Sequence, residues 1–165
     1  MIAIKNILVA TDFGEASDSA LSYGRELAGR FGATLHVLNV VENFYVTTFG
    51  AETYAAFVPD MQRELETTAR KRLDELLIDS DSSGPATRPV VTTSGSPAYA
   101  IVDYARENRI DLIVMGTHGR GALAQLMMGS VAERVVRIAS CPVLTVRHPE
   151  HEFVTPDALV AASRA

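Results

Sequence analysis

The segment from Gly116 to Ser130, GTHGRGALAQLMMGS, places glycines and a serine at a spacing that can do chemistry. Gly116 and Gly119 follow an apolar run, where a missing Cβ permits a positive φ and a close approach of a ligand to the backbone. Gly129 and Ser130 directly precede an amphipathic segment, so unpaired amide N–H groups, a helix dipole and a hydroxyl group would meet there. This pattern predicts an anion site that suits a triphosphate.

A plainer interpretation of the same segment is purely structural. Glycines end strands and serines cap helices in every α/β protein, and glycine content alone would favour that role. The segment is also no Walker motif, since no lysine precedes Ser130 and Arg120 is its only cation. Because Asp12 is the one nearby acid available for Mg²⁺, we expect nucleotide binding with at most slow hydrolysis.

Five short apolar runs rich in β-branched residues predict strands that are buried on both faces. These runs are Ile7 to Ala10, Leu35 to Val41, Pro89 to Thr92, Leu112 to Met115 and Val143 to Val146. Helical patterns separate them, so the chain predicts an α/β fold with one doubly wound, Rossmann-like, five-stranded parallel sheet and helices on both faces. Ligands of such sheets lie beyond the carboxyl ends of the strands, where the strand order reverses.

Four segments with helical spacing supply the covering helices. The first would bury Ala20, Leu21, Gly24, Leu27, Ala28 and Phe31 and stop at Gly32, and the second would bury Met61, Leu65, Ala69, Leu73, Leu76 and Leu77. The third would start at Ser96, with the hydroxyl as N-cap and Pro97 in the first helical position, and would bury Ile101, Val102 and Ala105. The fourth carries Ala132, Val135, Val136 and Ala139.

At this point the sequence resembles a known family. The signature Gly-x2-Gly-x9-Gly-Ser of the ATP-binding universal stress proteins is matched without a gap by Gly116, Gly119, Gly129 and Ser130. The segments that also look like this family are Ile7 to Phe13, Leu38 to Val40, Ser94 to Pro97, Asp111 to Met115 and Cys141 to Leu144. The resemblance covers residues 1–147 as one domain and leaves residues 148–165 as a tail that is flexible or contacts a partner.

The resemblance implies a strand order of 3-2-1-4-5 and ATP, ADP or AMP as the ligand, with Mg²⁺. Asp12 would meet the ribose with Ala10 and Thr11 beside it, and Val40 would contact the adenine. The residues Met115, Gly116, His118 and Gly119 would line the ribose and phosphate side, and Gly129, Ser130 and Val131 would hold the terminal phosphates. The family also implies a homodimer that pairs the last strand, Val143 to Val146, across a two-fold axis.

Other interpretations stay open for several of these residues. In the alternative interpretation, Asp12 only caps the helix that begins near Glu15, and His118 is an exposed loop residue. A nucleotide-free interaction module of the same family is the alternative function. A phosphorylated receiver domain would share the sheet, but the acid and lysine that it needs are replaced by the segment Thr92 to Ser94 and by Arg147.

Composition narrows the partners and the cellular compartment that we expect for the protein. The net charge of −5, the pI near 5.3 and the lack of a basic run oppose nucleic-acid binding. No apolar stretch approaches the roughly 18 residues of a membrane span, and no signal peptide is recognisable, so we expect a cytoplasmic protein away from membranes. The single cysteine, Cys141, precludes an internal disulfide and is interpreted as a small buried apolar residue.

Overall fold

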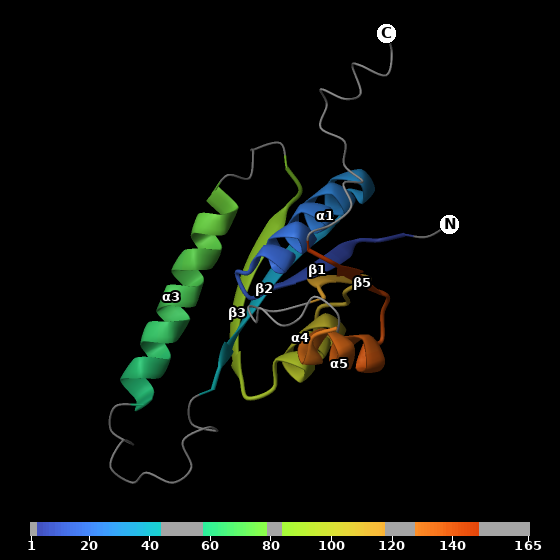
Figure 1. The fold of residues 1–165 in the computed structure, drawn as a ribbon. Coiled ribbons are helices and arrows are strands. Elements are labelled where there is room, and N and C mark those ends of the chain that lie inside the picture. Colours follow the sequence, from blue (N-terminus) through green and yellow to red (C-terminus); the bar gives the residue numbers. More distant parts are fainter. Residues whose placement is uncertain (1–2, 44–57, 79–83, 118–127, 149–165) are drawn as a thin grey trace.

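The computed structural model describes residues 3–43, 58–78, 84–117 and 128–148, which contain five strands and four helices (Figure 1). In chain order they are β1 (Asn6–Thr11), α1 (Glu15–Phe31), β2 (Thr34–Glu42), α3 (Val58–Ile78), β3 (Thr87–Ser94), α4 (Pro97–Glu107), β4 (Leu112–Gly116), α5 (Ser130–Ile138) and β5 (Val143–Val146). All neighbouring strands are parallel, in the order β3-β2-β1-β4-β5. The predicted fold class and strand order are confirmed.

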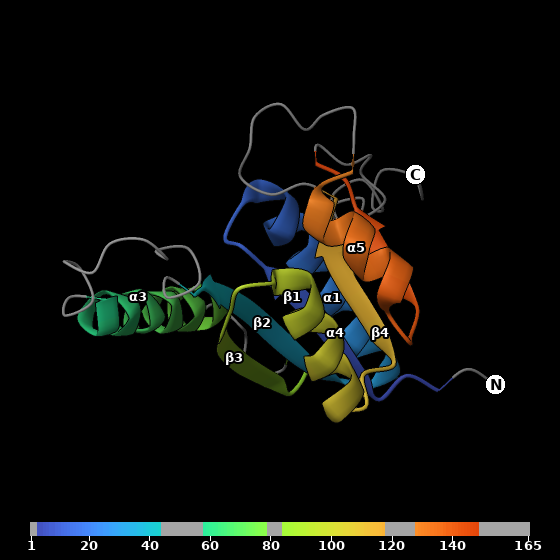
Figure 2. The same cartoon turned by 90° about the horizontal axis from the view of Figure 1, so that it is seen from below.

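The sheet separates two apolar cores. One core joins the odd-numbered β1 residues Ile7 and Val9 to α1 and α3, and the other joins Leu8 and Ala10 to α4 and α5. Figure 2 shows α4 and α5 in front of the sheet and α1 behind it. Because successive side chains of a strand point to opposite faces, residue parity in β1 and β2 decides which core each side chain enters.

Helix α1 ends as the sequence predicts but buries less of its last turn. Gly32 follows it in the left-handed conformation, with φ of 62°, which glycine adopts without steric cost. Gly24 lies so close to Val9 of β1 that a Cβ would collide with the valine side chain. The burial predicted for Phe31 is wrong, because this last residue of α1 is exposed.

The predicted buried face of α3 is wrong over its first two turns. Met61 is 48% exposed and Leu65 is also exposed, whereas Gln62 is 7% exposed. The reason is a polar contact with β3, in which the Thr93 hydroxyl donates to Glu66 Oε1 at 2.6 Å. Only the later part of α3 has the predicted apolar contact with the sheet, through residues such as Leu73.

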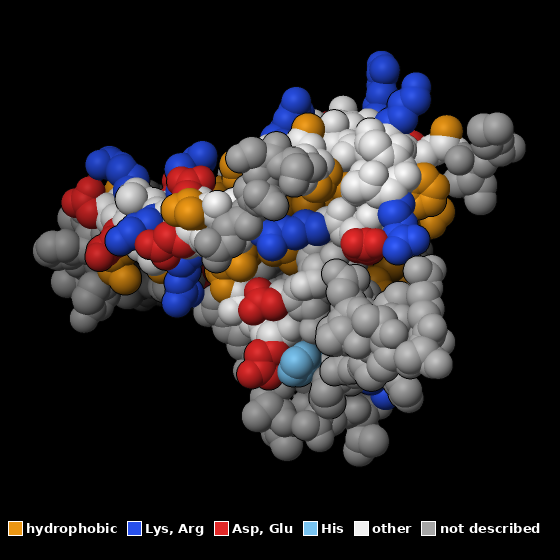
Figure 3. All heavy atoms as spheres, turned by 90° about the horizontal axis from the view of Figure 1, so that it is seen from above, with side chains coloured by type: hydrophobic (Ala, Val, Ile, Leu, Met, Phe, Trp, Pro, Cys, Tyr) orange, Lys and Arg blue, Asp and Glu red, His pale blue; other side chains and the backbone are white. Residues whose placement is uncertain are grey.

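The solvent face of α3 carries charges of both signs (left in Figure 3). Arg63 pairs with Asp60 at 3.4 Å and Lys71 with Glu75 at 3.8 Å, all four side chains being exposed. Such exposed pairs contribute little stability.

Within the described ranges, none of the helices is both long and apolar enough to span a bilayer.

The observed starts and ends of α4 and α5 differ in detail from the sequence-based prediction. Ser96 is the N-cap of α4 and Pro97 follows it, but the Ser96 hydroxyl makes no capping bond; instead the Ser96 amide donates to Ser94 Oγ at 3.1 Å. In α5, Val136 is exposed and Ala139 lies just past the last helical residue. Local pattern placed these helices correctly, while the turns and packing around them decided the details.

His36 links β2 to α4 inside the second core. The residue is 2% exposed, and its Nδ1 is hydrogen-bonded to the Tyr104 hydroxyl at 2.8 Å. Burial, and then the positive charge of Arg88, hold the pKa of His36 below its usual value. No cluster of three potential metal ligands occurs among the described residues. Cys141 is partly buried in the same core, and burial raises the pKa of its thiol.

Candidate functional site

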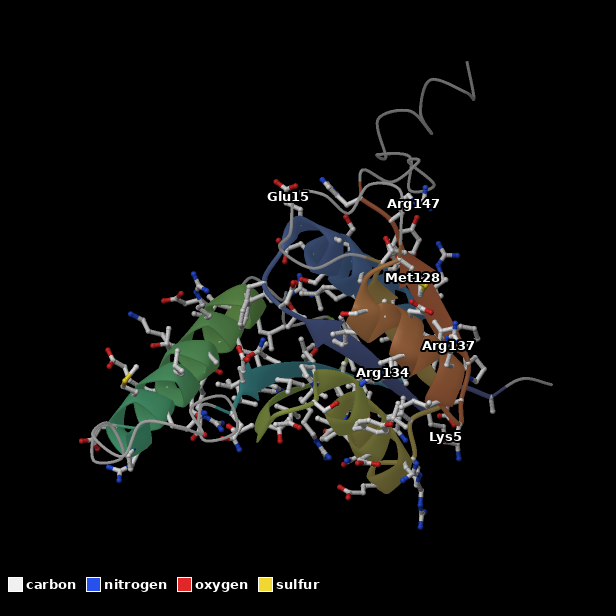
Figure 4. All side chains as sticks on the ribbon, turned by 60° about the horizontal axis from the view of Figure 1, so that its bottom comes forward. Lys5, Glu15, Met128, Arg134, Arg137 and Arg147 are labelled. Carbon is white, nitrogen blue, oxygen red and sulfur yellow. The ribbon has the colours of Figure 1, made fainter. Side chains whose placement is uncertain are left out.

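A cavity of about 350 Å³ opens at the carboxyl edge of the sheet, where the chain order reverses between β1 and β4. The nine described residues that the sequence proposed for the site all line it: Ala10, Thr11, Asp12, Val40, Met115, Gly116, Gly129, Ser130 and Val131. The other two, His118 and Gly119, lie outside the described residues. In Figure 4, Glu15 and Met128 mark the end of the sheet at which α1 and α5 begin, and Lys5 marks the opposite end.

One half of the cavity is apolar. Leu38 and Val40 of β2, Met115 of β4 and Ile101 of α4 form its walls, and all belong to or pack on the core beneath α4 and α5. Sequence reasoning missed six lining residues: Ser17, Leu38, Pro97, Ile101, Thr117 and Ala132. The signal for Leu38 was its parity with Val40 on one strand, and Pro97 and Ile101 lie in the first turns of a helix that starts at this edge. Such a surface suits a flat, weakly polar ring.

The other half is formed by the first turn of α5. The N-cap, Gly129, has φ −63° and ψ 149°, and its amide donates to Thr117 O at 2.7 Å. Because the N-cap is a glycine, it supplies no side chain to cap the helix, and the amides of Ser130, Val131 and Ala132 have no acceptor within it. Among the described lining residues there is no lysine or arginine. Attraction for an anion therefore comes from main-chain N–H groups and the helix dipole.

Asp12 is the only acidic residue among the described residues that line the cavity. Its Oδ1 accepts a hydrogen bond from the Gly14 amide at 3.0 Å. The interpretation of Asp12 as the cap of α1 is wrong, because Gly14 is the N-cap and its amide also meets Ser17 Oγ at 3.1 Å. The turn after β1 thus holds a carboxylate at the mouth of the cavity.

Strand β2 extends beyond β1 and leaves main-chain groups at the cavity wall. Thr34 N donates to Lys5 O, on the β1 side, and alternation along the strand turns the N–H and C=O groups of Val40 to that side as well. The ladder between β1 and β2 ends with Thr11 opposite Asn39. The Val40 carbonyl therefore lies one position past the last β1 pair, beside the apolar half of the cavity.

The reason for glycine at position 116 differs from the predicted one. Gly32 is the only described glycine with a positive φ, so Gly116 does not use that freedom. A Cβ at Gly116 would lie 2.8 Å from the carbonyl carbon of Ala16 and 2.9 Å from its oxygen. Glycine is needed here because β4 ends directly against the backbone of α1.

Comparison with known proteins gives consistent matches. The model of the Universal stress protein family matches residues 3–147. Universal stress protein A homolog 1 of Coxiella burnetii is 34% identical over 142 residues, which cover 86% of this chain and 95% of that protein. A solved structure of a protein from the universal stress protein family of Burkholderia pseudomallei is 33% identical, with a TM-score of 0.65 and coverage of 87% of this chain and 96% of that chain.

A further solved structure is described as a universal stress protein in complex with cAMP. It has a TM-score of 0.63 and 23% identity and covers 88% of this chain and 98% of that chain. At this identity the likeness shows the fold alone.

Proposed function

Because this chain belongs to the universal stress protein family, we propose that it binds an adenine nucleotide, ATP with Mg²⁺ in the first place, in the cavity beyond β1 and β4. The observation that carries the proposal is the first turn of α5, which begins after a glycine N-cap and offers amide donors across from an apolar wall. A solved protein of the same fold in complex with cAMP supports the class of ligand. The role would be nucleotide-dependent signalling in a stress response.

The base would lie against Val40, Leu38 and Ile101. The Val40 carbonyl is an acceptor, which matches the exocyclic amine of adenine and opposes the carbonyl oxygen that guanine carries at the same position. Ala10 and Met115 would pack beneath the nucleoside. This arrangement favours ATP over GTP.

The sugar and phosphates would lie between the turn after β1 and the first turn of α5. Asp12, with Thr11 beside it, would accept from the ribose hydroxyl groups. The amides of Ser130 and Val131 would donate to the terminal phosphates, following Gly129. Gly116, His118 and Gly119 would line the ribose and phosphate side, as the family resemblance implies.

The cavity is better suited to binding than to rapid hydrolysis. Efficient phosphoryl transfer needs a cation at the transferred group, carboxylates for Mg²⁺ and a group that orients water. Among the described lining residues, Asp12 is the one carboxylate and there is no basic side chain. We therefore expect at most slow ATP turnover.

Two measurements test the function. Mass spectrometry of the purified protein is expected to detect co-purified ATP, ADP or AMP. Calorimetric titration of nucleotide-free protein with ATP and then GTP is expected to give at least about tenfold tighter binding of ATP. Absence of nucleotide from the preparation together with no heat of ATP binding would favour the alternative, a nucleotide-free interaction module.

We also propose a homodimer through β5. This strand is at the edge of the sheet, and Leu144 on it is 37% exposed. The amide of Thr117 donates to Val146 O, so alternation turns the main-chain groups of Thr145 to the open edge. Light scattering is expected to give a dimer for the original protein and a monomer for Thr145→Pro, which removes one outward N–H group. A monomeric original protein at micromolar concentration would contradict this proposal.

A further inference from the structure

Phe13, directly after Asp12, has an unusual backbone conformation. Its φ is 62°, and Arg109 is the only other non-glycine residue with positive φ in the described ranges. Bulky side chains rarely adopt this left-handed conformation, which persists only where the surroundings enforce it and which often accompanies function.

The Phe13 side chain packs on the face of the sheet that α1 and α3 cover, and Phe13 is not among the described residues that line the cavity. Its ring is half-buried and packs on the core beneath α1 and α3. From α3, the guanidinium carbon of Arg72 lies 5.7 Å from the ring centroid, within the range of a cation–π contact. Figures 1 and 2 show that α3 and α5 lie far apart on the molecule. The ring thus holds the turn from a side that the nucleotide would not touch.

This turn determines what the cavity presents. In a continued parallel ladder, the Phe13 amide would be the next β1 donor to reach the Val40 carbonyl. It donates instead to Thr11 Oγ1 at 3.0 Å, and the following amide, that of Gly14, donates to Asp12 Oδ1 at 3.0 Å. The backbone turn at Phe13 therefore both ends β1 and fixes the Asp12 carboxylate at the mouth of the cavity.

We infer that Phe13 is a positioning residue for nucleotide selectivity: its ring, packed beneath α3, holds the turn that directs Asp12 to the ribose and leaves the Val40 carbonyl for the base. The inference rests on the proposed nucleotide function. Phe13 is not among the described residues that line the cavity, so its role acts through the turn. It also connects α3, which is remote from the cavity, to the groups that recognise the nucleotide.

The test compares ATP, dATP and GTP by calorimetry on five proteins. Phe13→Gly keeps a residue that tolerates positive φ but removes the ring, and it is expected to weaken ATP binding about tenfold and to reduce both the ATP/dATP and the ATP/GTP preference to near one. Phe13→Leu keeps an apolar anchor and is expected to retain both preferences. Arg72→Gln is expected to reduce them about threefold. Arg70→Gln, an exposed arginine of the same helix, is the matched control and is expected to change nothing.

Thermal unfolding of each variant separates selectivity from folding. A folded Phe13→Gly that keeps both preferences would overturn the positioning role while leaving the proposed function standing. An original protein that binds none of the three nucleotides would overturn both. A simple loss of stability would lower the affinity for all three nucleotides by the same factor, so unchanged ratios in a weakened variant also count against positioning.

Discussion

Replacing Ser130 with proline is expected to weaken ATP binding by roughly 10- to 100-fold without unfolding the protein. The substitution removes one main-chain donor at the first position of α5, where proline is well tolerated because its missing N–H has no partner inside the helix. The preceding residue already has the backbone that proline requires, since Gly129 has ψ of 149°. Calorimetric titration with ATP measures the effect.

Two controls isolate the main-chain contribution. Ser130→Ala removes the hydroxyl group alone and is expected to stay within about fivefold of the original affinity. Adenosine, which has no phosphate, is expected to bind both variants as it binds the original protein. If Ser130→Pro bound ATP as tightly as Ser130→Ala, the helix amides would have no role in holding phosphate.

Replacing Gly116 with alanine is expected to lower the melting temperature by about 3 to 9 °C, since overpacking of this kind costs about 1 to 3 kcal/mol. The new Cβ would approach Ala16 backbone atoms at 2.8 and 2.9 Å, and a helix backbone cannot move aside as a flexible side chain can. Differential scanning calorimetry measures the change. The same variant narrows the cavity, because Gly116 lines it.

The matched control is the same substitution at Gly29. This glycine lies on the exposed side of α1, and no neighbouring group lies within 4 Å of the place that a Cβ would take. Alanine there is expected to raise the melting temperature by about 2 to 3 °C, because it restricts the unfolded chain and favours helix. Equal effects at the two positions would mean that the contact between Gly116 and Ala16 carries no strain.

The sheet was predictable because its signals are local and repeated. Each of the five apolar runs lies within an observed strand, and for Val143 to Val146 the bounds coincide. Gly32 marked the end of α1 because left-handed caps have a strong residue preference. Strand order was not readable from periodicity, and the family resemblance supplied it.

The details that failed depend on contacts between distant parts of the chain. A Cβ does not fit at Gly116 because α1 packs directly against this position. No local sequence pattern shows that contact. The first turns of α3 bury Gln62 rather than Met61 because a glutamate on the helix meets Thr93 on β3. Ser96 does not cap α4 with its hydroxyl as expected, and its own amide donates to Ser94 Oγ.

In the cavity, too, some features were predictable from the sequence and others depend on contacts between distant parts of the chain. Glycine and serine spacing placed the first turn of α5 at the sheet edge, and the family resemblance added Asp12 and Val40. The turn after β1 was not predictable, because a phenylalanine at positive φ contradicts the residue preference for that conformation. Its explanation lies in the core beneath α3, which only the folded chain brings to Phe13.

A crystal structure of the protein grown with an excess of Mg-ATP tests the central claim most directly. We expect the triphosphate on the amides of Ser130 to Ala132, the ribose at Asp12 and the adenine amine at the Val40 carbonyl. A cavity that stays empty, or that is filled by side chains of the protein itself, would contradict the claim that this sheet edge is built to bind a nucleotide.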